Sequence, residues 1–320
     1  MIITCATDDN FVQHCCIMLV SLLLNNSDVD IYILTEGLKP ENEKIIRREV
    51  GKYNANIYFL IVDSDVVAKF PLPKDEGLKH ISRATYYRLF MAELLPKEVH
   101  KVIYLDCDII VDANIQDLWD IDLNEHAIAA VPQVGSGFEA FRLGYPVEYG
   151  YFNAGVNVLN LDYFRKNNIT AKLIDYISVN YSYIKYHDQD TLNAVLFDKC
   201  LHLLPQWNMS SVAYKAFLDK HGDSINGKII NEYKKEKANI KLFRNNPPIL
   251  HYVSKPKPWN RNCVHPLYQK YYYYAQKTIN FTHIKPQSKI SRLPSIIKHN
   301  IITLLSEIKQ RVITTDPSRL

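Results

Sequence analysis

The sequence of 320 residues contains no Cys-x-x-Cys pair and no cysteine spacing typical of a zinc site, although it has six cysteines. Most of them stand in apolar stretches, where we expect buried free thiols and therefore a reducing, cytoplasmic compartment. No stretch approaches the ~18 uninterrupted apolar residues of a transmembrane helix. The start, MIITCATDDN, has an acidic pair and no basic segment, which argues against a secretory signal.

The composition is that of a globular protein, with 47% hydrophobic and 12% aromatic residues. A chain of this length should bury roughly 75% of its unfolded surface, so the fold needs no disulfide. One elaborated domain of about 250 residues with an appendage is the expected organisation.

Positive charge is concentrated near the end of the chain. The net charge is +4, but residues 285–320 hold seven Lys or Arg against two acidic residues. The pattern changes after Pro258, where a Tyr271–Tyr274 run precedes this basic stretch. We expect a main domain over residues 1–265 and a Tyr-rich, basic appendage over 266–320.

Apolar residues in the appendage recur with a helical period from Leu293 to Val312, with basic residues off that stripe. A helix lying on an anionic membrane surface would have this pattern. A helix packed on the core or on a partner subunit would have it too, and both interpretations stay open. No nucleic-acid-binding motif is present, so we expect no nucleic-acid partner.

Strand-like and helical stretches alternate along the first half of the chain, which predicts an α/β fold with a mostly parallel sheet flanked by helices. Ligands bind such sheets beyond the carboxyl ends of the strands, which places Asp8, Asp9 and Asn10 at the mouth of a site. The predicted elements of this half are strands at Ile2–Thr7, Asp30–Thr35 and Asn56–Val62 and helices at Phe11–Leu24 and Pro40–Lys52.

The second half continues the pattern less regularly. Gly135–Gly150 is rich in glycine and aromatic residues and is predicted to be a loop. The predicted elements here are helices at Ser82–Leu95, Tyr163–Tyr181 and Asp188–Phe197 and strands at Lys101–Val111, Ala127–Val131 and Ala154–Leu161.

Asp106 and Asp108 stand in the middle of the apolar run 101–111. Two carboxylates two residues apart on a strand point to the same face, and burying both would cost several kcal/mol unless a cation neutralises them. Hard oxygen ligands suit Mg²⁺ or Mn²⁺. The alternative is that the strand ends at Leu105 and both aspartates lie in a solvated loop.

Six blocks of sequence, among them VIYLDCDII (102–110) and HYVSKPKPW (251–259), follow one another over residues 1–265. In their order and spacing they resemble the motifs of the family 8 retaining glycosyltransferases. The most similar members are bacterial lipopolysaccharide galactosyl- and glucosyltransferases. The resemblance implies a GT-A-type, Rossmann-like fold and transfer of galactose or glucose from a UDP-sugar to an oligosaccharide or glycolipid acceptor. The blocks are TCATDDNF (4–11), HISRATYYRL (80–89), VIYLDCDII (102–110), YFNAGVNVLN (151–160), HDQDTLN (187–193) and HYVSKPKPW (251–259).

The resemblance assigns a Mn²⁺ ion, with Mg²⁺ as the other candidate, to Asp106, Asp108 and His251. It also implies a donor-binding set around the uracil, ribose, diphosphate and sugar. Without the resemblance, His251 would be read as a strand-end histidine whose hydrogen bonds are satisfied, and Arg88 as part of a surface ion pair. The donor-binding set is Ala6, Asp8, Asn10, Arg88, Asp106, Cys107, Asp108, Asn153, Ala154, Gly155, Asp188, Gln189, His251, Ser254 and Lys257.

The resemblance places Asp188 and Gln189 beside the sugar ring. Retention through a covalent intermediate needs a carboxylate where Gln189 would lie, and an amide is a poor nucleophile. We therefore favour front-face substitution, in which the acceptor attacks from the leaving-group side. Asp190 is the second candidate nucleophile, although its direction on a helix should differ.

Ser254 stands where the most similar galactosyltransferases have glycine, so its side chain would either clash with the diphosphate or bond to it through the hydroxyl. Two other functions stay open: a non-catalytic UDP-sugar-binding or scaffold protein, and a self-glucosylating, glycogenin-like primer using Tyr271–Tyr274. The enzyme itself is expected in the cytoplasm, with the tail at the inner face of the membrane as one option.

Overall fold

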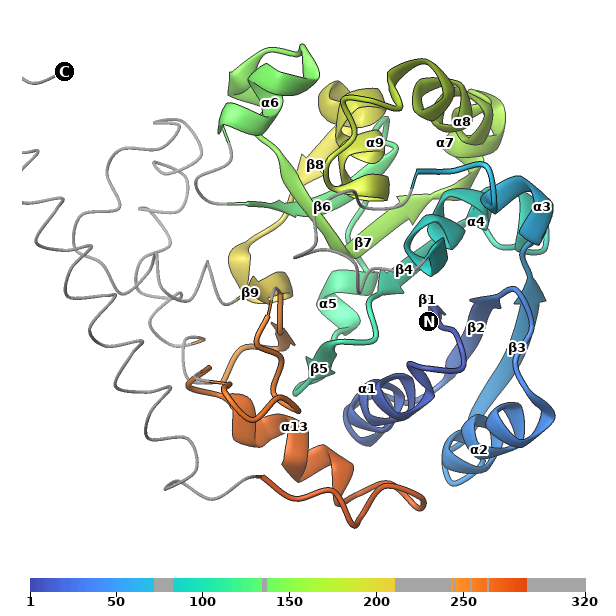
Figure 1. Cartoon of the computed structure of the whole chain (residues 1–320), viewed down its shortest axis with the longest axis vertical. Helices are drawn as coiled ribbons and strands as arrows, with labels where there is room; N and C mark the ends of the chain where they lie inside the picture. Colours follow the sequence, from blue (N-terminus) through green and yellow to red (C-terminus); the bar gives the residue numbers. More distant parts are fainter. Residues whose placement is uncertain are drawn as a thin grey trace, which may run out of the picture.

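A seven-stranded sheet with helices on both faces forms the centre of the computed structural model (Figure 1). The structure describes residues 1–71, 83–133, 137–210, 243, 246–253, 255–263 and 265–286. The strand order is β3-β2-β1-β4-β7-β6-β8, in which β7 runs antiparallel to its neighbours β4 and β6. The strands are β1 (Ile2–Ala6), β2 (Val29–Thr35), β3 (Ala55–Ile61), β4 (Lys101–Leu105), β6 (Ile128–Pro132), β7 (Phe152–Asn160) and β8 (Cys200–His202).

Successive residues of a strand point to opposite faces of the sheet and so belong to two separate hydrophobic layers. In β1, Ile3 and Cys5 face helices α1 (Val12–Asn25) and α2 (Pro40–Val50), whereas Val102 and Tyr104 of β4 face the other layer. That second layer is covered by η2 (Arg83–Phe90), α4 (Met91–Leu94), α7 (Leu161–Lys166), α8 (Ile169–Asn180) and α9 (His187–Leu196). The mostly parallel α/β sheet predicted from the alternation is confirmed.

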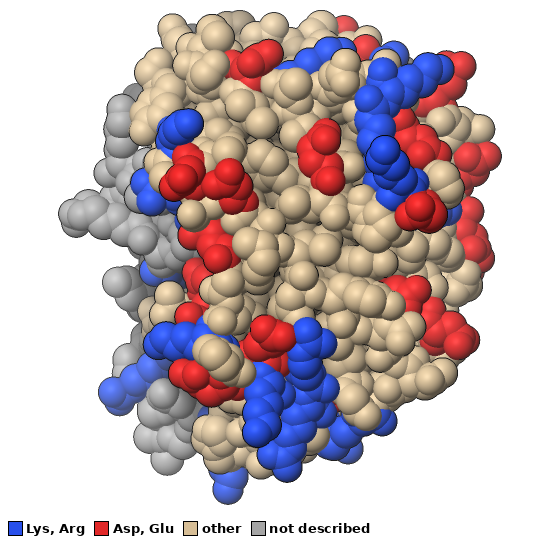
Figure 2. All heavy atoms as spheres, turned by 90° about the vertical axis from the view of Figure 1, so that its right-hand side faces the viewer, with Lys and Arg blue, Asp and Glu red and all other residues tan. Residues whose placement is uncertain are grey.

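The sheet ends at β3 on one side, and this edge strand exposes Tyr58 and Ile61. Figure 2 shows the corresponding face of the molecule, on which uncharged residues occupy the middle and clusters of charged residues surround them.

Six further short helices in the described part of the chain connect the larger elements. They are α3 (Ser64–Val67), α5 (Gln116–Trp119), α6 (Gly137–Leu143), η3 (Val147–Tyr149), η4 (Phe197–Lys199) and η5 (Pro205–Asn208).

Four predicted elements differ from the structure, and three of them lie outside the run 101–111. The helix expected over Tyr163–Tyr181 is divided in two, because Asn168 adopts a left-handed conformation with φ 51° between α7 and α8. The stretch expected as a loop over Gly135–Gly150 contains α6 and η3. The helix expected at Ser82–Leu95 is a 3₁₀ helix followed by one α-helical turn, and Ser82 lies outside the described residues.

The strand expected over 101–111 is also wrong, because it breaks at Asp106–Asp108. β4 ends at Leu105 in the large sheet, and β5 (Ile109–Val111) belongs to a second sheet. That small sheet has the order β5-β10-β9, with β10 (Ile249–His251) antiparallel to β5 and parallel to β9 (Met209–Ser210). The break moves two like charges out of an apolar strand and to the carboxyl edge of the large sheet.

The Tyr271–Tyr274 run lies on helix α13 (Tyr268–Ala275), which packs against α1. Tyr271, Tyr272 and Tyr274 are buried in a cluster with Ile17 and Leu250, and Tyr273 is 53% exposed. The basic, helix-like stretch predicted from Leu293 onward lies outside the described residues. Within the part of the chain that the structure describes, no helix is both long enough and apolar enough to span a membrane.

Candidate functional site

A pocket of about 690 Å³ opens at the carboxyl ends of β1 and β4. Its size is suitable for a nucleotide-sized ligand. Nearly all of the predicted site residues line it, although they come from distant parts of the sequence. Those in the lining are Ala6, Asp8, Arg88, Asp106, Cys107, Asp108, Asn153, Ala154, Gly155, Asp188, Gln189, His251 and Lys257.

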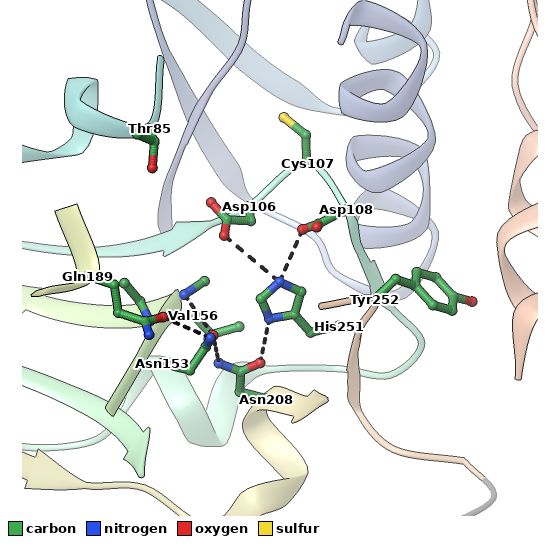
Figure 3. A network of polar contacts seen from close by, with 12 residues as sticks. Thr85, Asp106, Cys107, Asp108, Asn153, Val156, Gln189, Asn208, His251 and Tyr252 are labelled. Carbon is green, nitrogen blue, oxygen red and sulfur yellow. Dashed lines mark hydrogen bonds and ion pairs between the residues drawn. The ribbon is translucent and has the colours of Figure 1, made fainter. Parts of the chain in front are cut away.

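Asp106, Asp108 and His251 point toward one another at the junction of the two sheets (Figure 3). His251 Nε2 lies 3.1 Å from Asp108 Oδ1 and 3.9 Å from Asp106 Oδ2. One ligand atom from each residue falls within 4.8 Å of the other two. Two carboxylates and one imidazole form a ligand set that is chemically suited to a divalent cation such as Mn²⁺.

Two further observations show that the site fits such an ion. Asp108 Oδ1 is buried and accepts no hydrogen bond. A methyl group at Gly155 would lie 2.2 Å from His251 Cε1 and 2.9 Å from Asp106 Oδ2. The absence of a side chain at residue 155 therefore allows the three ligands to converge, and an unsatisfied carboxylate oxygen is available for a cation.

Arg88 is 5% exposed and joins Asp106 to Asp188 within the pocket. Its Nη2 lies 2.7 Å from Asp106 Oδ1 and its Nε 2.9 Å from Asp188 Oδ2. The guanidinium also lies 4.1 Å from the ring centroid of Tyr104 and donates to the carbonyl of Ala154. Arg88 is thus a buried, multiply bonded cation and not a surface ion pair.

Asp188 is buried beside Arg88 and accepts a hydrogen bond from Thr85. Burial raises the pKa of Asp188 to about 6, although Arg88 and Thr85 act in the opposite direction. At neutral pH the carboxylate is ionised, so it can accept hydrogen bonds from sugar hydroxyl groups.

Lys257 pairs with the carboxylate oxygen of Asp108 that does not face His251. Its Nζ lies 2.5 Å from Asp108 Oδ2 and 2.6 Å from the carbonyl oxygen of Tyr252. Burial would raise the pKa of Asp108, but the Lys257 ammonium holds it well below its usual range. The pocket thus combines a carboxylate pair with two fixed cations, Arg88 and Lys257, which suits a metal-bound diphosphate.

An aromatic stack supports the loop that carries Lys257. Trp259 stacks on His14 at 3.7 Å between ring centroids, and His14 Nδ1 lies 2.7 Å from the hydroxyl of Tyr271 on α13. Burial lowers the pKa of His14 to about 4, so the ring is neutral at pH 7. These contacts tie the loop to both α1 and α13.

The amide of Gln189 is held on both sides. Its Oε1 accepts from Asn153 Nδ2 at 2.9 Å and from Ala154 N at 3.1 Å, and its Nε2 donates to the hydroxyl of Tyr151 at 3.0 Å. Gln189 lines the pocket beside Asp188. The structure therefore presents the Gln189 side chain to the pocket as an amide of fixed orientation.

Asp190 is fully buried and does not line the pocket. Its Oδ1 accepts from Tyr151 and Arg142, and its Oδ2 accepts from the backbone N–H groups of Lys185 and Tyr186. These four hydrogen bonds occupy both carboxylate oxygens. The arrangement supports a structural role for Asp190.

Of the three polar residues Asp8, Asp9 and Asn10 that follow β1, one lines the pocket and two do not. Asp8 lines the pocket and caps the following turn by accepting from Asn10 N at 2.9 Å. Asn10 is exposed and outside the lining, and Asp9 bonds Lys39 N and Asn42 Nδ2. Cys107 lines the pocket with a buried thiol that points away from the aspartates (Figure 3) and donates to the carbonyl of Ala6. Ser254 lies outside the described residues.

Two residues that bond the site together were assigned no role from the sequence. Asn208, at the end of η5, lies outside the six blocks and contacts both Asn153 and His251. Tyr151 begins the block YFNAGVNVLN and contacts both Gln189 and Asp190. Buried polar residues of this kind are revealed by their partners in space, because neither composition nor periodicity marks them. All six cysteines are free, and five of them are buried as predicted.

The comparisons with known proteins agree with this geometry. A family model described as glycosyl transferase family 8 matches residues 2–263. The chain is 33% identical to General stress protein A of Bacillus subtilis over 283 residues, 87% of this chain and 93% of that protein. It is 26% identical to lipopolysaccharide 1,3-galactosyltransferase of Salmonella typhimurium over 303 residues, 92% of this chain and 81% of that protein.

Among solved structures, the fold is similar to that of the galactosyltransferase LgtC in complex with donor and acceptor sugar analogs. The TM-score is 0.76 at 24% identity, and the match covers 88% of this chain and 97% of that chain. The fold and the family match together define a glycosyltransferase with the expected GT-A-type architecture. The chain belongs to glycosyl transferase family 8, as its six motifs predicted.

Proposed function

We propose that this enzyme transfers galactose or glucose from a UDP-sugar to a saccharide or glycolipid acceptor, with retention at the anomeric carbon. The observation that carries the proposal is the convergence of Asp106, Asp108 and His251 beside Arg88, Asp188 and Gln189 in one pocket. The similarity to a lipopolysaccharide galactosyltransferase supports a role in the synthesis of lipopolysaccharide or another surface glycan.

In this proposal Asp106, Asp108 and His251 hold a divalent cation, with Mn²⁺ favoured over Mg²⁺. When bound, the cation would supply positive charge that stabilises the departing diphosphate. Lys257 and Arg88 add fixed positive charge on either side of the aspartates. Asp8 and Ala6 would bind the ribose and uracil, since they lie in the lining at the carboxyl end of β1.

The sugar would lie against Asp188 and Gln189. Asp188 accepts hydrogen bonds from its hydroxyl groups, and the Gln189 carbonyl dipole stabilises positive charge that develops at the anomeric carbon. The acceptor hydroxyl attacks from the leaving-group side and passes its proton to a β-phosphate oxygen of the donor. The burial and full hydrogen bonding of Asp190 favour this front-face route over a covalent intermediate.

The proposed organisation is a catalytic domain over residues 1–265 and an appendage over 266–320, with the protein in the cytoplasm. Attachment of the basic tail to the inner face of the membrane would bring a glycolipid acceptor within reach of the pocket.

The test is donor hydrolysis with UDP-galactose, UDP-glucose and UDP-N-acetylglucosamine, with Mn²⁺ and in a metal-free control. Slow release of UDP from one hexose donor that requires Mn²⁺ is the expected result, and it also identifies the sugar. UDP binding without release from any donor would favour a binding or scaffold protein. A mass increase of the protein itself would favour self-glucosylation, for which Tyr273 is the exposed tyrosine of α13.

A further inference from the structure

Backbone N–H groups determine how two side-chain amides of the site are oriented. The N–H of Gly155 lies 3.0 Å from Oδ1 of Asn153, and the N–H of Ala154 lies 3.1 Å from Oε1 of Gln189. A backbone N–H can only donate, so the amide atom that faces it must be the oxygen. The orientation of Asn153 and Gln189 therefore follows from the chain itself and involves no choice between two flips.

The orientation of Asn153 fixes that of Asn208. Because Asn153 presents its oxygen, Asn208 must turn its Nδ2 toward it, at 2.8 Å. Asn208 Oδ1 then faces Nδ1 of His251 at 2.8 Å, as Figure 3 shows. An amide oxygen can only accept, so Nδ1 of His251 must carry a hydrogen.

A neutral imidazole with its hydrogen on Nδ1 has a lone pair on Nε2. In this neutral form, Nε2 faces Asp108 Oδ1 and Asp106 Oδ2 with no hydrogen between the three ligand atoms. The buried Asp108 Oδ1 accepts no hydrogen bond, in agreement with this arrangement. A cation among these atoms would satisfy all three.

We propose that Asn208 is a positioning residue that holds His251 in the tautomer whose Nε2 can bind the divalent cation. This inference rests on the metal site of the proposed function. The bond from the second nitrogen of a metal-bound histidine to a fixed oxygen commonly sets the orientation and affinity of the ligand.

The same series of hydrogen bonds extends to the sugar side of the pocket. Asn153 donates to Gln189, Gln189 donates to the hydroxyl of Tyr151, and Tyr151 donates to Asp190 at 2.8 Å. Asp190 is a buried carboxylate, paired with Arg142, and can only accept. Every hydrogen from His251 to Asp190 therefore points in one direction. Reversing the series would oppose both backbone N–H groups, so the backbone at Ala154 and Gly155 fixes the orientation of Gln189 directly and that of His251 through Asn208.

The direct test is the tautomer of His251 in the wild-type protein without metal. Long-range ¹H–¹⁵N NMR of protein labelled at histidine, at pH 8, should show His251 with its hydrogen on Nδ1; the signal is assigned by its loss in His251→Asn. A hydrogen on Nε2 would overturn the proposal. This measurement needs neither donor nor turnover, so it is independent of the proposed reaction.

A second test measures Mn²⁺ affinity by the EPR signal of the free ion. Asn208→Leu should raise the Kd for Mn²⁺ by about 10- to 100-fold. Asn208→Asp still offers an oxygen to Nδ1 of His251, so it should keep its affinity for Mn²⁺ within a few-fold of the wild type. The matched control is Asn26→Leu, a buried asparagine whose hydrogen bonds go to backbone groups away from the pocket.

Wild-type affinity in Asn208→Leu, or equal losses of affinity in Asn208→Leu and Asn208→Asp, would contradict the assigned role. Loss of Mn²⁺ affinity in Asn208→Leu in a protein that releases no UDP from any donor would keep the positioning role and reject the proposed reaction.

Discussion

Gly155 lies against His251 so closely that a methyl group on its Cα would fall 2.2 Å from Cε1 of the imidazole. Gly155 belongs to β7 and His251 ends β10, so the contact joins the two sheets at the metal site. The glycine is needed for space, since real Cβ contacts this short do not occur.

Gly155→Ala should therefore displace His251 and weaken Mn²⁺ binding at least tenfold, the effect expected when a metal ligand loses its position. Titration with Mn²⁺ of the folded variant measures it. Gly51→Ala, at the end of α2 and far from the pocket, should bind as the wild type does. Unchanged affinity in Gly155→Ala would mean that His251 is not a ligand.

Asp108→Ala should abolish metal-dependent donor binding while the fold stays intact. The carboxylate contributes one ligand atom, and its other oxygen holds Lys257. Calorimetric titration of UDP with and without Mn²⁺ measures the loss. Asp117→Ala, an exposed change on α5, serves as the control, and a metal-dependent signal that survives in Asp108→Ala would argue against the assigned site.

Asp190→Asn should destabilise the protein by about 3 kcal/mol, because it leaves Arg142 without its buried partner and changes bonds to two backbone N–H groups. Urea unfolding measures the difference. Asp198→Asn breaks a pair whose side chains are 42–43% exposed and should have little effect. A stable variant that accumulates no product would instead favour a chemical role for Asp190.

The rate should depend on the ionisation of Asp188. Its pKa of about 6 predicts that kcat/KM falls as the pH drops through 6, because the protonated carboxyl loses its pairing with Arg88 and one hydrogen-bond acceptor for the sugar. The pH profile between 5 and 8 tests it. The residual activity of Asp188→Asn should show no such step near pH 6; a step that persists there would assign the titration to another group.

Much of the architecture could be predicted because the hydrophobic pattern of each segment matches the side that the segment buries in the fold. The first three strands and two helices were placed within about two residues, and the six motifs identified the family. Asp106 and Asp108 show where a local pattern misleads. The apolar residues on both sides predicted one strand, but they belong to two sheets, and the aspartates form the turn between them.

The alternative for those aspartates was half correct. The strand does end at Leu105, yet the loop is not solvated, since Asp108 is 15% exposed at its side chain. Whether a loop is buried depends on what packs over it, here Lys257 and His251 from about 150 residues later in the chain. For the same reason Asn208 could not be found and Tyr151, although inside a block, was given no role, because both act only through distant partners.

The position of the proposed metal ligands at the turn between the two sheets has a thermodynamic consequence. Asp106 leaves the large sheet, while Asp108 and His251 adjoin strands of the small one, so a bound ion would be bonded to both. An ion that binds only the folded state adds its binding free energy to the free energy of unfolding. Stability measured in a chelating buffer would then underestimate that of the metal-bound enzyme, and the concentration of available metal would set how tightly the two sheets are held together.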